Sequence, residues 1–246
     1  MKPPLVVDMM SKDDLLWRCL HGGPLSSGKS DPGGLPDDAP WAEFRTRNIL
    51  FLKNLTEIYG ACGVVAKTGS WYIGHLRFYP KIVRELAAPG LGLCLQQEFP
   101  YGPAGDFGRG SFPPLEEIKD KTILVHCMMI AADVPGDKPR RRQGTGTRMA
   151  RALIDWARAK GWHAIEATAY EALPVVYAAT GQAGRRFWEN LGFRLVRTDR
   201  EPTLAEESEF VRKMREEALT QGFDPAKIVN RYVMRLDLPK AVVSCL

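Results

Sequence analysis

The chain has 246 residues, of which 45% are hydrophobic, and a formal net charge of +5. That length and apolar content suffice for one elaborated domain with a sizeable core. No apolar run approaches the roughly 20 residues of a membrane-spanning helix, and the first residues lack the apolar stretch of a signal peptide. We therefore expect a cytoplasmic protein with no membrane partner.

The five cysteines are odd in number and scattered along the chain, and none belongs to a Cys-x-x-Cys pair. Structural zinc sites and disulfide frameworks both require closer and more regular spacing. The sequence therefore disfavours a disulfide framework, and we expect no metal in the functional site.

Residues 1–60 predict a strand followed by two helices. Residues 5–10 are apolar enough for an opening strand, and the capping signal at Ser11 predicts a short helix over 13–20. A second helix begins at Pro40, because proline suits the first helical turn, and ends near Gly60.

Residues 23–30 match the pattern Gly-x-x-x-x-Gly-Lys-Ser of nucleotide-binding P-loops. That mechanism requires a helix that begins at the lysine. Pro32, Gly33, Gly34 and Pro36 follow within a few positions and oppose a helix there. A flexible polar loop is therefore favoured over a phosphate-binding loop.

The middle of the chain predicts a hairpin and then an insertion. Residues 62–67 and 71–78 flank Thr68-Gly69-Ser70, which is typical of a β-hairpin. Residues 80–119 are rich in glycine and proline and predict an inserted loop. A binding loop or lid and a plain surface loop both remain open for this insertion.

The central stretch predicts a buried strand, a basic turn and a long helix. Residues 123–130 are continuously apolar, as in a strand buried on both faces. After the turn, apolar residues recur at helical spacing as Met149, Leu153, Ile154 and Trp156. A helix start exposes backbone N–H groups and a partial positive charge, which together bind phosphate. Gly144 and Gly146 let a phosphate approach the backbone, and the arginines 140–142 add charge.

The last third of the chain alternates helices and strands. Strands are predicted over 163–169, 193–197 and 228–238. A short helix is predicted over 183–191 and a charged one with a narrow apolar stripe over 204–221.

Two motifs carry a resemblance to a known family. The order Arg141-x-x-Gly144-x-Gly146, between a strand and a helix, resembles the acyl-CoA-binding motif of the GNAT superfamily of acyl-CoA N-acyltransferases. The later stretch 186–193, Arg-Phe-Trp-Glu-Asn-Leu-Gly-Phe, resembles that family's aromatic-x-x-Leu-Gly-Phe motif. The resemblance covers 121–196, the expected acyl-CoA-binding core, and the flanks only by element order.

The resemblance implies an α/β fold, more fully α+β, with all of 1–246 in one domain. Its mixed central sheet would have about seven strands flanked by helices. The inserted loop and an extra helix before the last strand would be additions to that plan.

The resemblance also implies the activity. The strands on either side of the motif helix would splay apart, and the pantetheine arm of acetyl-CoA, or of another acyl-CoA, would lie between them. A primary amine of a small molecule or peptide would then attack the thioester directly in a ternary complex. The chain would thus be an N-acyltransferase, most simply an acetyltransferase, and a homodimer is compatible with this.

The implied cofactor-binding residues form two groups. Backbone groups along the arm would come from Met128, Met129 and Ile130. The turn that holds the diphosphate would comprise Arg141, Arg142, Gln143, Gly144, Thr145, Gly146 and Thr147.

The catalytic groups are less standard. The family often has a tyrosine as the acid just before Glu-x-Leu-Gly-Phe, and here that position is Trp188, whose indole N–H is no practical proton donor. Tyr170 and Tyr177 are the nearest substitutes, with a packing role as the alternative for each. Glu166, a carboxylate in an apolar strand, is the candidate base, because burial raises a carboxyl pKa towards neutrality. A solvated, edge-facing glutamate is the alternative.

Three further hypotheses remain open. Cys127 could accept an acyl group, but only with a nearby base. The chain could bind acyl-CoA without turnover, as a sensor or scaffold. It could also be a basic nucleic-acid-binding module that uses the arginines 140–142, although no aromatic stacking motif accompanies them and nucleic acid is disfavoured as a partner.

Overall fold

The computed structural model describes nine stretches of the chain: 3–12, 15–17, 20, 25–26, 45–87, 112–131, 143–180, 182–201 and 208–239. Within them, the strands are β1 (Leu5–Met9), β2 (Leu25–Ser26), β3 (Gly63–Thr68), β4 (Trp71–Pro80), β5 (Thr122–Ile130), β6 (Ala164–Ala169), β7 (Arg194–Arg200) and β8 (Asn230–Asp237). The α-helices are α1 (Arg45–Tyr59), α2 (Lys81–Ala87), α3 (Thr145–Ala159), α4 (Pro174–Thr180), α5 (Arg185–Glu189) and α7 (Glu209–Thr220). Two 3-10 turns are η2 (Leu115–Glu117) and η3 (Pro225–Lys227).

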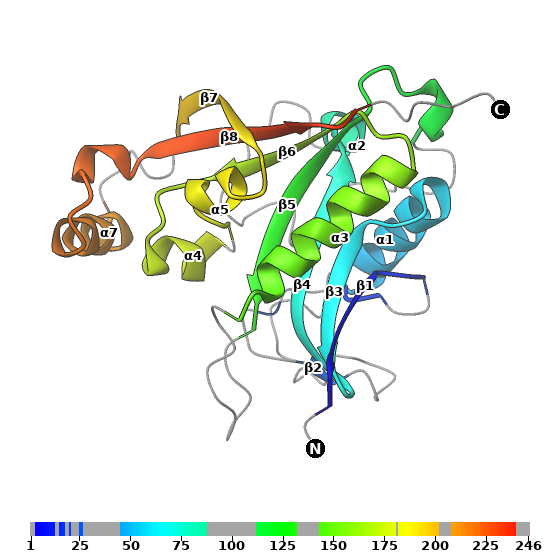
Figure 1. Ribbon diagram of the computed structural model, residues 1–246, viewed down its shortest axis with the longest axis horizontal. Coiled ribbons are helices and arrows are strands. Elements are labelled where there is room, and N and C mark those ends of the chain that lie inside the picture. Colours follow the sequence, from blue (N-terminus) through cyan, green and yellow to red (C-terminus); the bar gives the residue numbers. More distant parts are fainter. Residues whose placement is uncertain are drawn as a thin grey trace.

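The described strands form one eight-stranded sheet in the order β1-β3-β4-β5-β6-β8-β7, with β2 paired to β4 beside this path. Strands β5 and β6 are parallel, because α3 connects them as a crossover, and the other pairs are antiparallel. The last strand, β8, lies between β6 and β7 (Figure 1). The predicted α/β class and mixed sheet are therefore confirmed.

Strands β5 and β6 pair only at their beginnings. Their register runs from Thr122 opposite Ala164 to Val125 opposite Ala167 and then stops, although β5 continues to Ile130. On its other side β5 stays paired with β4, but His126 is an extra residue there, because Arg77 and Phe78 face Cys127 and Val125. Such a bulge bends the strand and increases its twist. We call residues 126–130 the splayed segment of β5.

Helix α3 covers one face of the sheet along β1, β3, β4 and β5 (Figure 1). Its apolar stripe is buried as predicted, with Met149 and Leu153 at most 1% exposed. Met149 lies over Gly74 of β4, where an added Cβ would stand 3.2 Å from the methionine methyl group. The small residue therefore lets the helix approach the strand closely.

Helix α1 covers the opposite face of this half of the sheet. Alternate residues of β4 point to opposite faces. Phe78 meets Trp156 of α3 with ring centroids 5.1 Å apart, whereas Tyr79 meets Phe51 of α1 at 5.5 Å. The predicted helix that ends near Gly60 is thus present, with Leu52 and Leu55 in the core.

A smaller apolar cluster lies beyond the end of β6. Helices α4 and α7 pack together there around Val176, Val211 and Met214, and Tyr170 and Ile228 complete the cluster. The predicted helix before the last strand is confirmed as α7, whose N-cap Ser208 accepts a hydrogen bond from the Val211 amide.

Three local differences separate the structure from the sequence expectations. The described residues of 13–20, which are 15–17 and 20, are not helical, so the capping signal was misleading. Helix α2 follows β4 without a break, where the sequence predicted only an inserted loop, and α4 was not predicted. Most of the predicted loop lies outside the described residues, as does most of 23–30, of which Leu25–Ser26 is the strand β2.

Replacing Leu153 by alanine tests whether the contact of α3 with the sheet holds the fold together. The deletion leaves a cavity in the core and should lower the free energy of unfolding by about 2–5 kcal/mol. Asp155→Ala, on the exposed side of the same helix, should change it by less than about 0.5 kcal/mol. Urea unfolding of both variants checks this, and equal effects would contradict the packing described.

Candidate functional site

The start of α3 has an open and specialised backbone. Gly144 is the N-cap and has a φ of +78°, a left-handed conformation that glycine adopts without a steric penalty. An added Cβ at Gly144 would meet nothing within 4 Å, so it is conformation, not crowding, that selects glycine here. Gln143 and Gly144 are exposed, and Thr145 is buried.

The first amides of α3 point out of the helix. The N-cap Gly144 has no side chain to cap this end, and no backbone carbonyl of the described residues accepts a hydrogen bond from Thr145, Gly146 or Thr147. The first intrahelical bond runs from the Arg148 amide to the Gly144 carbonyl at 3.0 Å. The turn therefore retains three N–H groups for an anion, together with the positive end of the helix dipole.

This helix start lies directly beside the splayed segment of β5. A Cβ at Gly146 would stand 3.4 Å from the Met128 methyl group and 3.5 Å from the ring of Phe187. The two groups of predicted cofactor-binding residues are therefore neighbours in space. Arg141 and Arg142, the basic part of the motif, lie outside the described residues.

The backbone of the splayed segment faces two ways. The Ala131 amide bonds the Ile73 carbonyl at 2.9 Å, so in this antiparallel ladder Met129 turns its backbone groups towards β4. Met128 and Ile130 therefore turn theirs to the side that β6 has left. The pantetheine contacts expected from Met128 and Ile130 fit this register, whereas the Met129 backbone belongs to the ladder with β4.

Two side chains from beyond β6 bond this freed edge. The Ile130 amide donates to the Tyr177 hydroxyl at 2.9 Å, and the Gln182 side-chain amide donates to the His126 carbonyl. Tyr177 belongs to α4, and Gln182 follows it closely in the chain. One candidate acid is thus placed directly on the strand expected to hold the thioester.

The two tyrosines that the sequence offered as acids lie in different surroundings. Tyr177 is half-buried at the splayed segment, whereas Tyr170 is 1% exposed within the second apolar cluster. The Tyr170 hydroxyl donates to the buried carboxylate of Glu201 at 3.2 Å. Of the two candidate acids, Tyr177 therefore lies at the splayed segment, whereas Tyr170 contacts Glu201 within the second apolar cluster.

Trp188 has a packing role at the position where the family often has its tyrosine. Its side chain is 1% exposed, and its ring packs against Phe187 and Phe193 with centroids 5.0 and 4.9 Å away. The indole nitrogen has no hydrogen-bond partner among the described residues. The buried indole of Trp188 therefore offers no practical proton donor at this position.

Glu166 lies in the paired part of β6 and is held by an arginine. The Arg235 guanidinium on β8 donates to its carboxylate at 2.6 Å. The side chain of Arg235 is 25% exposed and that of Glu166 is 17% exposed. A base at this position would have to act while its carboxylate is bound to a cation. Glu166 therefore remains a candidate base, but not the isolated carboxylate that the sequence led us to expect.

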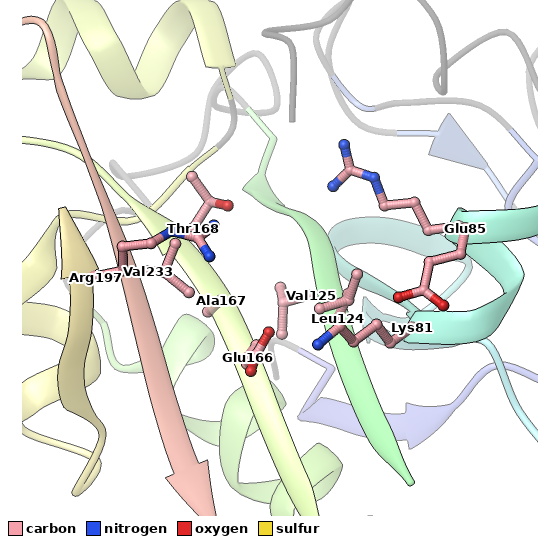
Figure 2. A pocket seen from close by; sticks show the side chains of 10 residues that line it. Lys81, Glu85, Leu124, Val125, Glu166, Ala167, Thr168, Arg197 and Val233 are labelled. Carbon is pink, nitrogen blue, oxygen red and sulfur yellow. The ribbon is translucent and has the colours of Figure 1, made fainter. Parts of the chain in front are cut away.

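A pocket of about 200 Å³ opens beside Glu166. Figure 2 shows Thr168 and Arg197 on one side of it, and Lys81 and Glu85 of α2 on the other. Its lining includes Val125 and Ala167, the last residues at which β5 and β6 pair. The pocket therefore adjoins the point at which the strands separate.

Thr168 is a site residue that the sequence analysis missed. It is 2% exposed and lines the pocket, yet its hydroxyl has no hydrogen-bond partner in the described part of the chain. Buried hydroxyls are nearly always bonded, so this one is suited to a ligand. A threonine in a short apolar strand carries no sequence signal that would have singled it out.

Cys127 has a histidine beside it on the adjacent strand. Its sulfur lies 3.2 Å from Nε2 of His75 on the adjacent strand, and both residues are buried. A thiol beside an imidazole is the arrangement that covalent acyl transfer needs. The sequence could not pair these residues, because 52 positions separate them.

Two classes of feature are absent from the described residues. They contain no helix that is long and apolar enough to cross a membrane. Nor do they contain a group of three or more histidine, cysteine, aspartate or glutamate side chains that could hold a metal ion.

No protein-family model and no curated protein matches this chain. Solved structures that resemble it include a GNAT-family acetyltransferase from Streptococcus pneumoniae, 12% identical, with 96% of this chain and 100% of that chain covered and a TM-score of 0.48. Another is the ribosomal-protein-S18-alanine N-acetyltransferase from Escherichia coli, 11% identical, with 99% of both chains covered and a TM-score of 0.47.

A third similar structure is a putative acetyltransferase from Salmonella typhimurium with its cofactor acetyl-CoA. It is 13% identical, 97% of this chain and 96% of that chain are covered, and the TM-score is 0.46. Likenesses of this strength do not define an activity. The mixed sheet that the sequence resemblance implies is present in the chain itself, with strands that part beside the start of α3.

Gly144→Ala tests the conformation of the helix start. A Cβ in the left-handed region costs about 1–2 kcal/mol, so the free energy of unfolding should fall by that amount. Gly146→Ala is the matched control, since Gly146 is helical and its added methyl group meets only ordinary contacts. Thermal or urea unfolding should show no loss of stability for Gly146→Ala. A loss of stability in Gly146→Ala but not in Gly144→Ala would contradict the assigned backbone conformation.

Proposed function

We propose that this chain is an acyl-CoA-dependent N-acyltransferase, most simply an acetyltransferase, that acts on a primary amine. One observation carries the proposal. The amides of Thr145, Gly146 and Thr147, which bond no backbone acceptor among the described residues, lie beside a strand whose backbone its parallel neighbour has released. An acyl-CoA has a diphosphate for the first feature and an amide-bearing arm for the second.

The two features also suit one ligand because of their order along the chain. The splayed segment ends at Ile130 and α3 begins at Thr145, so the released strand edge and the helix start belong to one strand-turn-helix unit. A ligand that lies along the edge with its diphosphate at the helix start would place its acyl end near the parting of β5 and β6. The pocket adjoins that point.

In the proposed reaction, the amine nitrogen attacks the thioester carbonyl carbon, a C–N bond forms and the C–S bond breaks. The sulfur leaves with the electron pair and takes up a proton, and the nitrogen loses one. Tyr177 is the candidate to give the proton, because its hydroxyl lies at the splayed segment, where it accepts the Ile130 amide before a ligand binds. Glu166, directly or through water, is the candidate to receive the proton of the amine.

Acyl-CoA binding would require Tyr177 and Gln182 to release part of the strand edge. Their hydrogen bonds to Ile130 and His126 occupy groups that a pantetheine arm would use. Met128 lies between these two residues and turns its backbone groups to the same side. Movement of α4 and the residues after it would therefore accompany binding.

A second candidate function is acyl-CoA binding without turnover, as in a sensor or scaffold. The observation that favours it is the buried Trp188 at the position where the family often has a tyrosine. The two functions differ in thiol release from acetyl-CoA in the presence of amines, which only the enzyme shows.

Thr147→Glu separates ligand binding from folding. Thr147 is the third residue of α3, where a carboxylate interacts favourably with the helix dipole by about 0.3–1 kcal/mol. The same charge would stand in the proposed diphosphate site and should weaken CoA binding at least tenfold. Calorimetry should thus show weaker CoA binding by the variant, whereas a urea titration should show that its stability is not lowered.

The control is Thr198→Glu, which adds the same charge to an exposed position of β7. It should leave CoA affinity unchanged. A stable Thr147→Glu protein with the CoA affinity of the parent chain would count decisively against the proposed diphosphate site.

Tyr177→Phe tests the proposed acid. Loss of the hydroxyl should lower kcat for thiol release by about 10²-fold or more, because general acid catalysis contributes at that scale. CoA affinity should fall little or rise, since the hydroxyl no longer holds the Ile130 amide. Tyr170→Phe is the matched control: it should reduce stability by about 1–3 kcal/mol, because Glu201 loses a partner, and leave kcat of the folded enzyme near that of the parent. The reverse pattern would assign the proton to Tyr170.

A further inference from the structure

The pocket beside the parting of β5 and β6 has an apolar floor and a charged rim. Leu124, Val125, Ala167 and Val233 supply the apolar part. Five ionisable residues also line it. The cations are Lys81, Arg84 and Arg197, and the carboxylates are Glu85 and Glu166. The rim thus carries more positive than negative groups, which is unusual for a site that would receive only a positively charged amine.

The two carboxylates of the lining offer little to a second cation. Glu166 is bound to Arg235 at 2.6 Å, so its charge is already offset. Glu85 is exposed on α2, where water screens it. A polyamine or a lysine-rich peptide would therefore meet only the arginine-bound Glu166 and the water-screened Glu85 in the pocket wall.

Two cations of the rim, Lys81 and Arg197, are held in solvent-accessible ion pairs. Lys81 and Arg197 pair with Asp120 and Asp199 at 3.2 and 2.8 Å, and the exposed fractions of the two cations are 34% and 65%. Exposed ion pairs of this kind contribute little to the stability of the fold, so they can rearrange around a ligand. Both cations thus remain able to turn towards an anionic ligand group.

Arg84 lies close to a second arginine. Burial and then repulsion from Arg231 lower the pKa of Arg84 below its ordinary value. Arg231 in turn bonds Asp199 and Glu201. An anionic ligand group beside Arg84 would offset the repulsion between the two guanidinium groups.

Thr168 supplies the polar contact on the floor. Thr168 lines the pocket, and its buried hydroxyl has no partner among the described residues. A hydroxyl accepts a hydrogen bond from an amine N–H and so can orient the nitrogen lone pair. Thr168 follows Ala167, the last residue of β6 that pairs with β5. An amine nitrogen bound to Thr168 would therefore lie where β5 and β6 part.

We propose that this pocket binds the acceptor, and that the acceptor is a small primary amine that also carries an anionic group such as a carboxylate or a phosphate. Thr168 takes the amine, and Arg84, with Lys81 and Arg197 at the rim, takes the anion. The pocket volume of about 200 Å³ lies below the ~300–1,000 Å³ of sites for larger ligands, so a small molecule fits better than a peptide. This inference rests on the proposed acyltransferase function for the identity of the second substrate.

The experiment compares matched ligands on the full chain by calorimetry, with and without CoA. Amino acids are paired with their decarboxylated counterparts, such as phenylalanine with phenethylamine, and O-phosphoethanolamine is paired with ethanolamine. In at least one pair the anionic member should bind tenfold more tightly or better, and in acyl transfer from acetyl-CoA it should have the higher kcat/KM. Equal affinities within every pair, or tighter binding of the decarboxylated members, would overturn the proposal.

Two variants locate the contacts. Arg84→Gln should remove the preference for the anionic member while the decarboxylated member binds as before, and Thr168→Val should weaken both members by a similar factor. Arg158→Gln, which removes an exposed arginine from the far end of α3, should change neither. If Arg84→Gln does not fold, the ligand pairs on the parent chain still decide.

The CoA titration keeps the two proposals apart. Failure of CoA to bind, with the preference for anionic amines intact, would remove the acyltransferase function and leave the pocket assignment. CoA binding and acyl transfer without the preference for anionic amines would support the acyltransferase function and remove the pocket assignment.

Discussion

The parting of β5 from β6 is the feature on which the rest of the site depends. Four residues of each strand pair, and the extra residue His126 then bends β5 while β5 remains bonded to β4. A bulge in the interior of a sheet leaves backbone groups without a ladder partner, which is costly unless something else bonds them. The chain meets this cost with side chains from one segment, and the same groups are then open to exchange with a ligand.

The start of α3 complements this edge because one crossover connects the two. A parallel pair requires such a connection, and it returns the helix start to the end of the sheet where β5 leaves its partner. Gly146 lets the first turn lie against Met128, and Gly144 lets the chain enter the helix in a left-handed conformation. The position of the first amides of α3 and the released strand edge are thus consequences of one local topology.

The sequence predicted most of the fold because its signals were local. The continuous apolar run of β5 and the periodic stripe of α3 are patterns that depend on burial alone, and both were confirmed. The capping signal at Ser11 failed, since one hydrogen-bond pattern does not supply the packing that most helical stability requires. Helix α2 was missed because it is short and lies in a stretch dominated by glycine and proline.

The site was predictable only in part, for a related reason. Backbone features of the turn follow from glycine spacing, so Gly144 and Gly146 could be identified in advance. The bond of Tyr177 to Ile130, the pairing of Glu166 with Arg235 and the contact of His75 with Cys127 join residues 47, 69 and 52 positions apart. Such pairs are set by sheet register, which a single sequence does not reveal at side-chain detail. Thr168 is the extreme case, because its importance lies in a missing partner.

The contacts of Tyr177 and Gln182 also bear on how a ligand could enter at low energetic cost. Exchanging one hydrogen bond for another of similar geometry changes the free energy little, because the net contribution of each is only about 0.5–1.5 kcal/mol. The strand edge would thus be protected without ligand and still open to it. Both side chains come from the stretch around α4, which packs against α7 through Val176 and Met214 and through the bond of the Val175 amide to Glu217. The helix that elaborates the chain before its last strand therefore supports the segment that would have to move, and the mobility of α4 against α7 would govern access to the splayed segment.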